Sequence, residues 1–99
     1  MARFEIGTVV VTQQISYDMK TKALFREEIF DALNKYHDGD WGTLCSDDVT
    51  ANEKALENPD DLYLMGAYLT SRGKVFIITC RKSERPGDNV TTICYPEER

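Results

Sequence analysis

The sequence has few of the features that mark secreted, membrane-spanning or zinc-binding proteins. Its three cysteines, at positions 45, 80 and 94, are odd in number, widely spaced and without a Cys-x-x-Cys pair. Neither a disulfide framework nor a zinc finger is therefore indicated. No apolar run approaches the roughly 20 residues of a membrane-spanning helix, and the first residues do not resemble a signal peptide. We therefore expect a soluble, cytoplasmic protein with reduced thiols.

Basic residues are also in the minority. Twelve Lys and Arg stand against 17 Asp and Glu, which gives a net charge of −5. This balance argues against direct nucleic-acid binding, which depends on neutralising phosphates, and against adsorption to an anionic membrane. Two interpretations stay open: the charge only keeps the protein soluble, or it forms an acidic face that meets a basic partner.

Signatures of catalysis are equally scarce. The single histidine, His37, lies eight residues before Cys45, but no nucleophile elbow or family motif supports a thiol catalyst. A helix-capping or loop-fixing role is the favoured interpretation of His37. No glycine-rich nucleotide cradle, Walker lysine or calcium loop is present. The sequence therefore predicts a protein that is not an enzyme and that holds no cofactor or metal.

Ordinary globular patterning is what remains, and 99 residues suffice for one domain, residues 1–99. Periodicity and turn residues predict strands over 4–12, 62–70, 75–80 and 90–95, and helices over 21–37 and from Asp47 or Asp48 to about 57. The fold class is α+β. The expected sheet is antiparallel with about four strands, a C-terminal three-stranded meander plus the N-terminal strand, covered on one face by the two helices.

An aromatic residue in a polar loop is the most distinctive local feature. Trp41 follows Asp40, and Gly39 and Gly42 frame the pair. As scaffold, the indole pins the loop onto the core and the glycines give the backbone room. As a binding element, it is the kind of aromatic anchor enriched at interaction hot spots. The first interpretation is favoured, and both hold if one ring face is exposed.

Two sets of polar residues are candidates for binding. Carboxylates are dense between Asp38 and Asp61 and would present an acidic face. Basic side chains and hydroxyls flank the connection between the last two strands, where they could converge on an anion such as a nucleotide phosphate. That second set comprises Arg81, Lys82, Arg85, Thr79, Thr91 and Thr92. Ordinary strand threonines and loop-solvating basic residues are the competing explanation.

A resemblance emerges from a longer series of residues. The series runs from His37-x-Gly39-Asp40-Trp41-Gly42 through Asp48, Asn52, Ala67-Tyr68, Ile77-Ile78-Thr79 and Thr91-Thr92-Ile93 to Pro96-Glu97-Glu98. It resembles an uncharacterised family of short bacterial, plasmid and phage proteins. Its members are often labelled "plasmid-related protein" or "type I restriction endonuclease subunit M". The similarity covers roughly residues 4–98 and implies an accessory protein of a mobile genetic element, a setting in which small acidic proteins often interfere with host defence.

The chain departs from that family between the last two predicted strands. Where relatives carry an acidic residue and an Asp-Arg pair, this chain has the longer and less acidic segment 80–89. The methylase label is physically implausible, because a methyltransferase needs a doubly wound sheet, a glycine-rich cofactor turn and a base-flipping pocket.

Two functions from different classes follow. The first is a non-enzymatic protein that inhibits or modulates a host nucleic-acid-handling or defence protein through its acidic face. The alternative is a small-ligand binder, for example of a nucleotide signal, that acts as a homo-oligomer; a homodimer would form if the last strand left a free edge. The candidate binding residues for the two functions are Asp40, Trp41, Asp47, Asp48, Asn52, Tyr68, Thr79, Arg85, Thr91 and Thr92.

Overall fold

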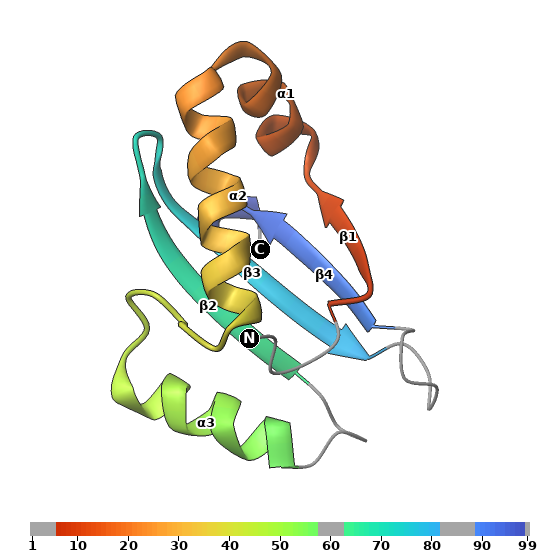
Figure 1. Ribbon diagram of the computed structural model, residues 1–99, viewed down its shortest axis with the longest axis vertical. Helices are drawn as coiled ribbons and strands as arrows, with labels where there is room; N and C mark the ends of the chain where they lie inside the picture. The colour runs from red at the N-terminus through yellow and green to blue at the C-terminus, as the bar shows by residue number, and fades with distance from the viewer. Residues whose placement is uncertain (1–5, 58–62, 82–88, 99) are drawn as a thin grey trace.

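The computed structural model describes residues 6–57, 63–81 and 89–98. Its elements, in chain order, are β1 (Thr8–Val11), α1 (Gln13–Thr21), α2 (Ala23–His37), α3 (Ser46–Glu57), β2 (Tyr63–Thr70), β3 (Gly73–Arg81), β4 (Asn89–Cys94) and the short 3₁₀ helix η2 (Pro96–Glu98). The domain is α+β, as the sequence predicted, and α2 lies across one face of a four-stranded sheet (Figure 1).

The sheet is mixed, which corrects the antiparallel sheet expected from the sequence. Its strand order is β1-β4-β3-β2. The β2–β3 and β3–β4 pairs are antiparallel and form the predicted meander, whereas β1 pairs with β4 in parallel. Parallel neighbours need a long crossover connection, and the helices between β1 and β2 let the chain cross the sheet before the meander begins. The free-edge expectation for the last strand is also wrong, because β4 is an inner strand.

Three α-helices, rather than two, accompany the sheet. The helix expected over 21–37 is preceded by a separate helix, α1, and the two are divided at Lys22, whose backbone is extended at φ −132° and ψ 103°. The Thr12 side chain caps α1 by accepting a hydrogen bond from the Ile15 backbone N–H at 3.3 Å. The break lets Ile15 of α1 and Phe25 of α2 enter the same core.

The core lies between α2 and the near face of the sheet. From α2 come Phe25, Ile29, Ala32 and Tyr36, all buried. Phe25, Ile29 and Tyr36 form, with the half-buried Leu33, the apolar stripe of α2, whereas Phe30 is 54% exposed. From the sheet come the alternate strand residues Leu64, Tyr68, Val75, Ile77 and Ile93. The side chains between these positions point to the opposite face of the sheet, because successive strand residues alternate.

The α3 helix begins at Ser46, before both of the predicted caps. Asp47 and Asp48 therefore lie inside its first turn, where carboxylates complement the positive end of the helix dipole. The helix lies beside β2, and Asn52 accepts from the Met65 N–H at 3.2 Å and donates to the Met65 carbonyl at 2.7 Å. The buried Asn52 amide thus satisfies the backbone N–H and carbonyl of Met65 on the edge of β2 that faces away from β3.

Candidate functional site

A polar groove opens between α2, the loop that follows it and the end of β2. Its volume is about 240 Å³. The lining residues are Glu28, Asp31, Ala32 and Lys35 from α2, Asp40, Gly42 and Thr43 from the loop, and Tyr68 and Leu69 from β2. Three carboxylates and one ammonium thus face one small space. We call this set of residues the acidic groove.

Two of the three carboxylates are held in place by hydrogen bonds from the rest of the chain. Glu28 accepts from the Ser71 hydroxyl at 2.6 Å and from the Ser71 backbone N–H at 3.0 Å, which ties α2 to the β2–β3 turn. One carboxylate oxygen of Asp40 accepts from the Gly42 N–H at 3.1 Å. Such contacts limit the rotation of both side chains, so less conformational entropy is lost when a ligand orders them.

The third carboxylate, Asp31, forms an ion pair with Lys35 at 3.2 Å, one helical turn apart. Both side chains are more than half exposed. An exposed pair of this kind is weak and exchanges readily with other partners. The lining therefore keeps an excess of negative charge and suits a cationic side chain, above all the planar guanidinium of arginine, which can contact two carboxylate oxygens at once.

The loop that forms one wall of the groove is anchored by the aromatic residue noted in the sequence. Trp41 is 5% exposed and lies edge-on to Tyr36, with ring centroids 5.5 Å apart. Its indole N–H donates to Glu53 of α3 at 3.2 Å. Trp41 is therefore packed as scaffold, the first of its two interpretations, and it fixes the position of the neighbouring Asp40.

Backbone pairing completes this anchor. The Ala67 N–H donates to the Trp41 carbonyl at 3.1 Å, and the Thr43 N–H donates to the Ala67 carbonyl at 2.7 Å. The bridge between them is Gly42, whose φ is +74°, and an added Cβ there would lie 2.0 Å from the Ala67 carbonyl oxygen. Only glycine fits this position. The wall of the groove is thus an extension of the sheet edge.

Tyr68 joins the same arrangement from β2. Its hydroxyl donates to the Asp40 backbone carbonyl at 2.6 Å, and the side chain is buried beneath the groove. Burial raises the pKa of the Tyr68 phenol above its usual value, so the group remains a neutral donor. Asp40 and Tyr68, both predicted from the sequence, therefore meet in the groove.

The buried threonines lie in the interior. The Tyr36 hydroxyl donates to Thr79 at 2.8 Å, the Thr79 and Thr91 hydroxyls are 2.7 Å apart, and Thr91 donates to the Ile6 carbonyl at 2.8 Å. Thr79 and Thr91 have no exposed surface. Since each hydroxyl proton can serve one acceptor, Thr79 is the donor to Thr91. Thr92 points to the opposite face of the sheet, away from both.

The remaining predicted site residues are dispersed. Asn52 is buried against β2, while Asp47 and Asp48 are exposed on α3. The Asp48 carboxylate accepts from the Cys45 thiol at 3.3 Å. Arg85 falls outside the described residues. The structure therefore brings two of the ten candidates, Asp40 and Tyr68, into the lining of the groove.

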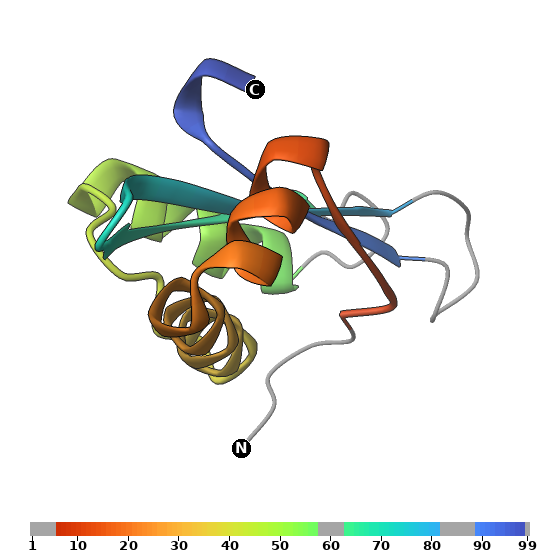
Figure 2. The same cartoon turned by 90° about the horizontal axis from the view of Figure 1, so that it is seen from above.

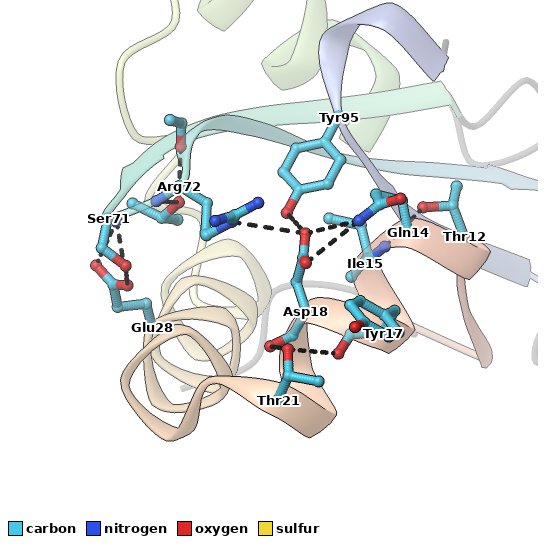
Figure 3. A network of polar contacts seen from close by, with 12 residues as sticks. Thr12, Gln14, Ile15, Tyr17, Asp18, Thr21, Glu28, Ser71, Arg72 and Tyr95 are labelled. Atoms are coloured by element: carbon cyan, nitrogen blue, oxygen red, sulfur yellow. Dashed lines mark hydrogen bonds and ion pairs between the residues drawn. The ribbon is translucent and has the colours of Figure 1, made fainter.

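A second polar cluster joins α1 to the other end of the sheet (Figure 3). The buried Asp18 carboxylate accepts a hydrogen bond from the Tyr95 hydroxyl and one from the Gln14 amide at 3.3 Å, and it lies 3.6 Å from the Arg72 guanidinium. The Tyr95 hydrogen bond holds the pKa of Asp18 below its usual value. Burial, reinforced by this carboxylate, raises the pKa of Tyr95 to about 12. The Asp18 carboxylate contacts all three of the other groups, so this cluster fastens α1 and the β2–β3 turn to the end of β4.

Sequence reasoning missed three of the charged residues in the groove. Glu28, Asp31 and Lys35 lie three and four positions apart on α2, which places them on one helix face. They flank the apolar stripe on the side toward β2. The spacing was visible in the sequence. The neighbouring wall was not, because it depends on how the loop after α2 pairs with β2.

Comparison of the chain with protein-family models, with curated proteins and with solved structures found no match. Within residues 6–57, 63–81 and 89–98, no three His, Cys, Asp or Glu side chains come together in a way that could hold a metal ion. None of the helices in this part of the chain is long and apolar enough to cross a membrane.

Proposed function

We propose that this chain is a non-enzymatic binding protein whose acidic groove receives a basic side chain of a partner protein. The observation that carries the proposal is the convergence of Glu28, Asp31 and Asp40 on one groove with a single ammonium beside them. Complementary charge speeds encounter with a basic partner and selects against acidic ones.

The size of the groove favours a side chain over a complete small molecule. Pockets for drug-sized ligands enclose about 300–1,000 Å³ and are mostly apolar, whereas this groove has about 240 Å³ and a polar lining. The threonines considered for a nucleotide site are buried and bonded to one another. Nucleotide binding is therefore the second candidate, and a thermal-shift screen of nucleotides with this chain is its direct test.

The resemblance to short plasmid and phage proteins supplies the setting of the proposal. In that setting the partner is a host nucleic-acid-handling or defence protein, because such proteins carry basic surfaces for their nucleic-acid substrates. Occupying such a surface would inhibit the partner without any reaction by this chain.

Charge reversal in the groove tests the binding step. We expect the double variant Asp31→Lys/Asp40→Lys to weaken binding of a fluorescent arginine-containing peptide by about tenfold or more, since two attractive contacts worth up to roughly 1 kcal/mol each become repulsive. The dependence of binding on salt should flatten as well. The double variant Glu57→Lys/Glu97→Lys is the matched control, with the same change in net charge at exposed positions outside the groove. Equal losses in the two double variants would show that only overall charge matters.

The proposed role of the chain in inhibiting a host defence protein is tested in cells. We expect expression of the chain to raise the plating efficiency of a phage on bacteria that carry a defence system inhibited by it, and the groove variant to abolish that gain. No change against any member of a panel of defence systems would contradict the proposed setting. The peptide-binding measurement would still test whether the acidic groove binds an arginine side chain.

A further inference from the structure

The strands carry almost no charge on either side of the sheet. None of the 17 acidic residues lies in β1, β2, β3 or β4, whose sequences are TVVV, YLMGAYLT, GKVFIITCR and NVTTIC. A sheet with one solvated face ordinarily alternates apolar and polar residues. Here the alternation is absent, which is the pattern of a sheet that is covered on both faces.

The face opposite α2 is defined by the strand register. Three rows of residues cross it: Thr8-Val90-Cys80-Tyr63, Val10-Thr92-Ile78-Met65 and Cys94-Phe76-Ala67. We call these eleven residues the outer face. No member of the three rows is charged, and the next pair on the same side, Leu69 with Lys74, places one ammonium beside them. Figure 2 shows α2 on the other side of the sheet, while the C-terminal η2 lies on this side.

Two of the three rows meet solvent, whereas Ala67 and Cys94 of the third row are buried within the chain. Val10 is 45% exposed and Tyr63 is 49% exposed, at opposite edges of the sheet. Between them Met65, Phe76, Ile78 and Val90 are half-buried, whereas Ile77 and Ile93, on the covered side of the same strands, are at most 1% exposed. A contiguous apolar patch of this kind marks an interaction surface.

We propose that the outer face is a dimer interface, on which the outer face of a second copy of this chain packs sheet against sheet. Two such sheets would lie about 10 Å apart with their strands at roughly 30°, the aligned packing of β-sandwiches. The contact is isologous, so each residue of the face meets the same surface on the other copy. The dimer would then have its two helical layers on the outside.

The area of the outer face agrees with a second copy of the chain as its partner. Four strands at about 4.8 Å and three rows at about 6.7 Å give on the order of 400 Å² in projection, and the accessible surface of protruding side chains is larger. Two copies would bury on the order of 1,000 Å² or more, near the lower end of specific protein interfaces. The expected dimer is therefore reversible.

The distribution of charge favours a second copy over a charged partner. The three rows of the outer face offer no ion to select an acidic or basic protein, and the single ammonium at their margin, Lys74, leaves the face mainly apolar, so an identical face matches it in kind. The carboxylates that give the chain its net charge of −5 lie outside the strands. The α2 carboxylates of two copies would be separated by both sheets, well beyond the screening length of about 8 Å in physiological salt.

Sedimentation velocity on the complete chain tests the dimer. We expect the wild-type protein to show a concentration-dependent shift from monomer to dimer between about 1 µM and 1 mM, the range for small interfaces. Ile78→Glu, at the centre of the face, and Val10→Glu, at its exposed edge, should each raise the dimer dissociation constant by about 100-fold, because a charge would be buried without a partner. Val10→Glu changes a side chain already 45% exposed in one copy, so it tests the interface even if Ile78→Glu unfolds the chain.

Phe30→Glu is the matched control. Phe30 is 54% exposed on α2, and its replacement makes the same type of change on the helical side. We expect it to leave the dissociation constant unchanged. A wild-type chain that stays monomeric to about 1 mM, or a Val10→Glu variant that dimerises as well as wild type, would overturn the proposal. So would a Phe30→Glu variant that is monomeric, because the contact would then lie on α2.

Discussion

The two faces of the sheet are built from similar residues but end in different environments. On the face toward α2, Ile77 and Ile93 are enclosed, and even the hydroxyls of Thr79 and Thr91 have partners inside the protein. On the outer face, their neighbours Ile78 and Thr92 are only half-buried. The apolar sequence of the strands therefore indicates that both faces of the sheet are covered. It does not indicate whether this chain itself covers both of them. The helical layer, with its acidic groove, supplies one cover.

The largest expected difference between the faces concerns adjacent isoleucines. We expect Ile77→Ala to lower the free energy of unfolding by about 2–5 kcal/mol, because it leaves a cavity in the core. Ile78→Ala should cost only about 1 kcal/mol in the monomer, since its side chain already meets solvent there. Urea denaturation of both variants at a protein concentration that keeps the chain monomeric measures the difference.

Concentration sharpens this comparison. If the outer face is an interface, wild-type stability rises with protein concentration, because only the folded chain dimerises. Ile78→Ala should reduce that dependence and Ile77→Ala should retain it. Equal losses for the two variants in dilute solution would mean that the faces are equally covered within one copy.

A smaller difference is expected between adjacent threonines. Thr91→Val removes the hydroxyl that joins Thr79 to the Ile6 carbonyl and leaves buried polar groups without that partner. The expected cost is about 1–3 kcal/mol. Thr92→Val, on the outer face, should change stability by no more than about 0.5 kcal/mol, because valine suits a strand equally well. Thermal unfolding of the two variants decides the comparison; a neutral Thr91→Val would show that the hydroxyl chain does not stabilise the core.

The smallest effect is restricted to acid and concerns the cluster at the end of β4. The folded-state pKa of Asp18 lies below its ordinary value of 3.8. Its contribution to stability is therefore present above pH 3.8 and is lost as the pH falls through the folded pKa. We expect Asp18→Asn to flatten the decline in the denaturation midpoint below pH 3.8. Thr91→Val is the control and should keep the wild-type slope. An unchanged slope in Asp18→Asn would contradict the role of the Tyr95 hydrogen bond.

The alkaline side of the dependence of stability on pH tests the same pair of residues, Asp18 and Tyr95. The pKa of Tyr95 is raised from its ordinary value of 10 to about 12, so its contribution to stability is complete below pH 10 and is lost between pH 10 and about 12. Tyr95→Phe should reduce the alkaline dependence by the share of this one phenol, while the part due to the raised pKa values of Tyr36 and Tyr68 remains. Absorbance titration of the phenols checks it, and a Tyr95 that ionised near pH 10 would argue against the buried hydrogen bond.

Local patterns predicted the elements well where the chemistry is local. The helix over 21–37, the three strands of the meander and the burial of Trp41 all follow from residue types and their spacing. The separate helix α1 was not predicted, although the helix expected over 21–37 begins within two residues of α2. The position of α1 depends on a contact with a distant segment, because its Asp18 is bonded to Tyr95 near the far end of the sequence.

The sequence by itself determined the α+β class, the meander, the excess of negative charge outside the strands and the apolar character of both sheet faces. Each of these depends on residue identity and on a period of two or 3.6. Only the tertiary structure decided that β1 joins β4 in parallel, that Glu28 and Asp31 meet Asp40, and that Thr79 and Thr91 lie in the interior. These depend on contacts between distant segments, and the free energy of such contacts comes from the packing of the whole chain.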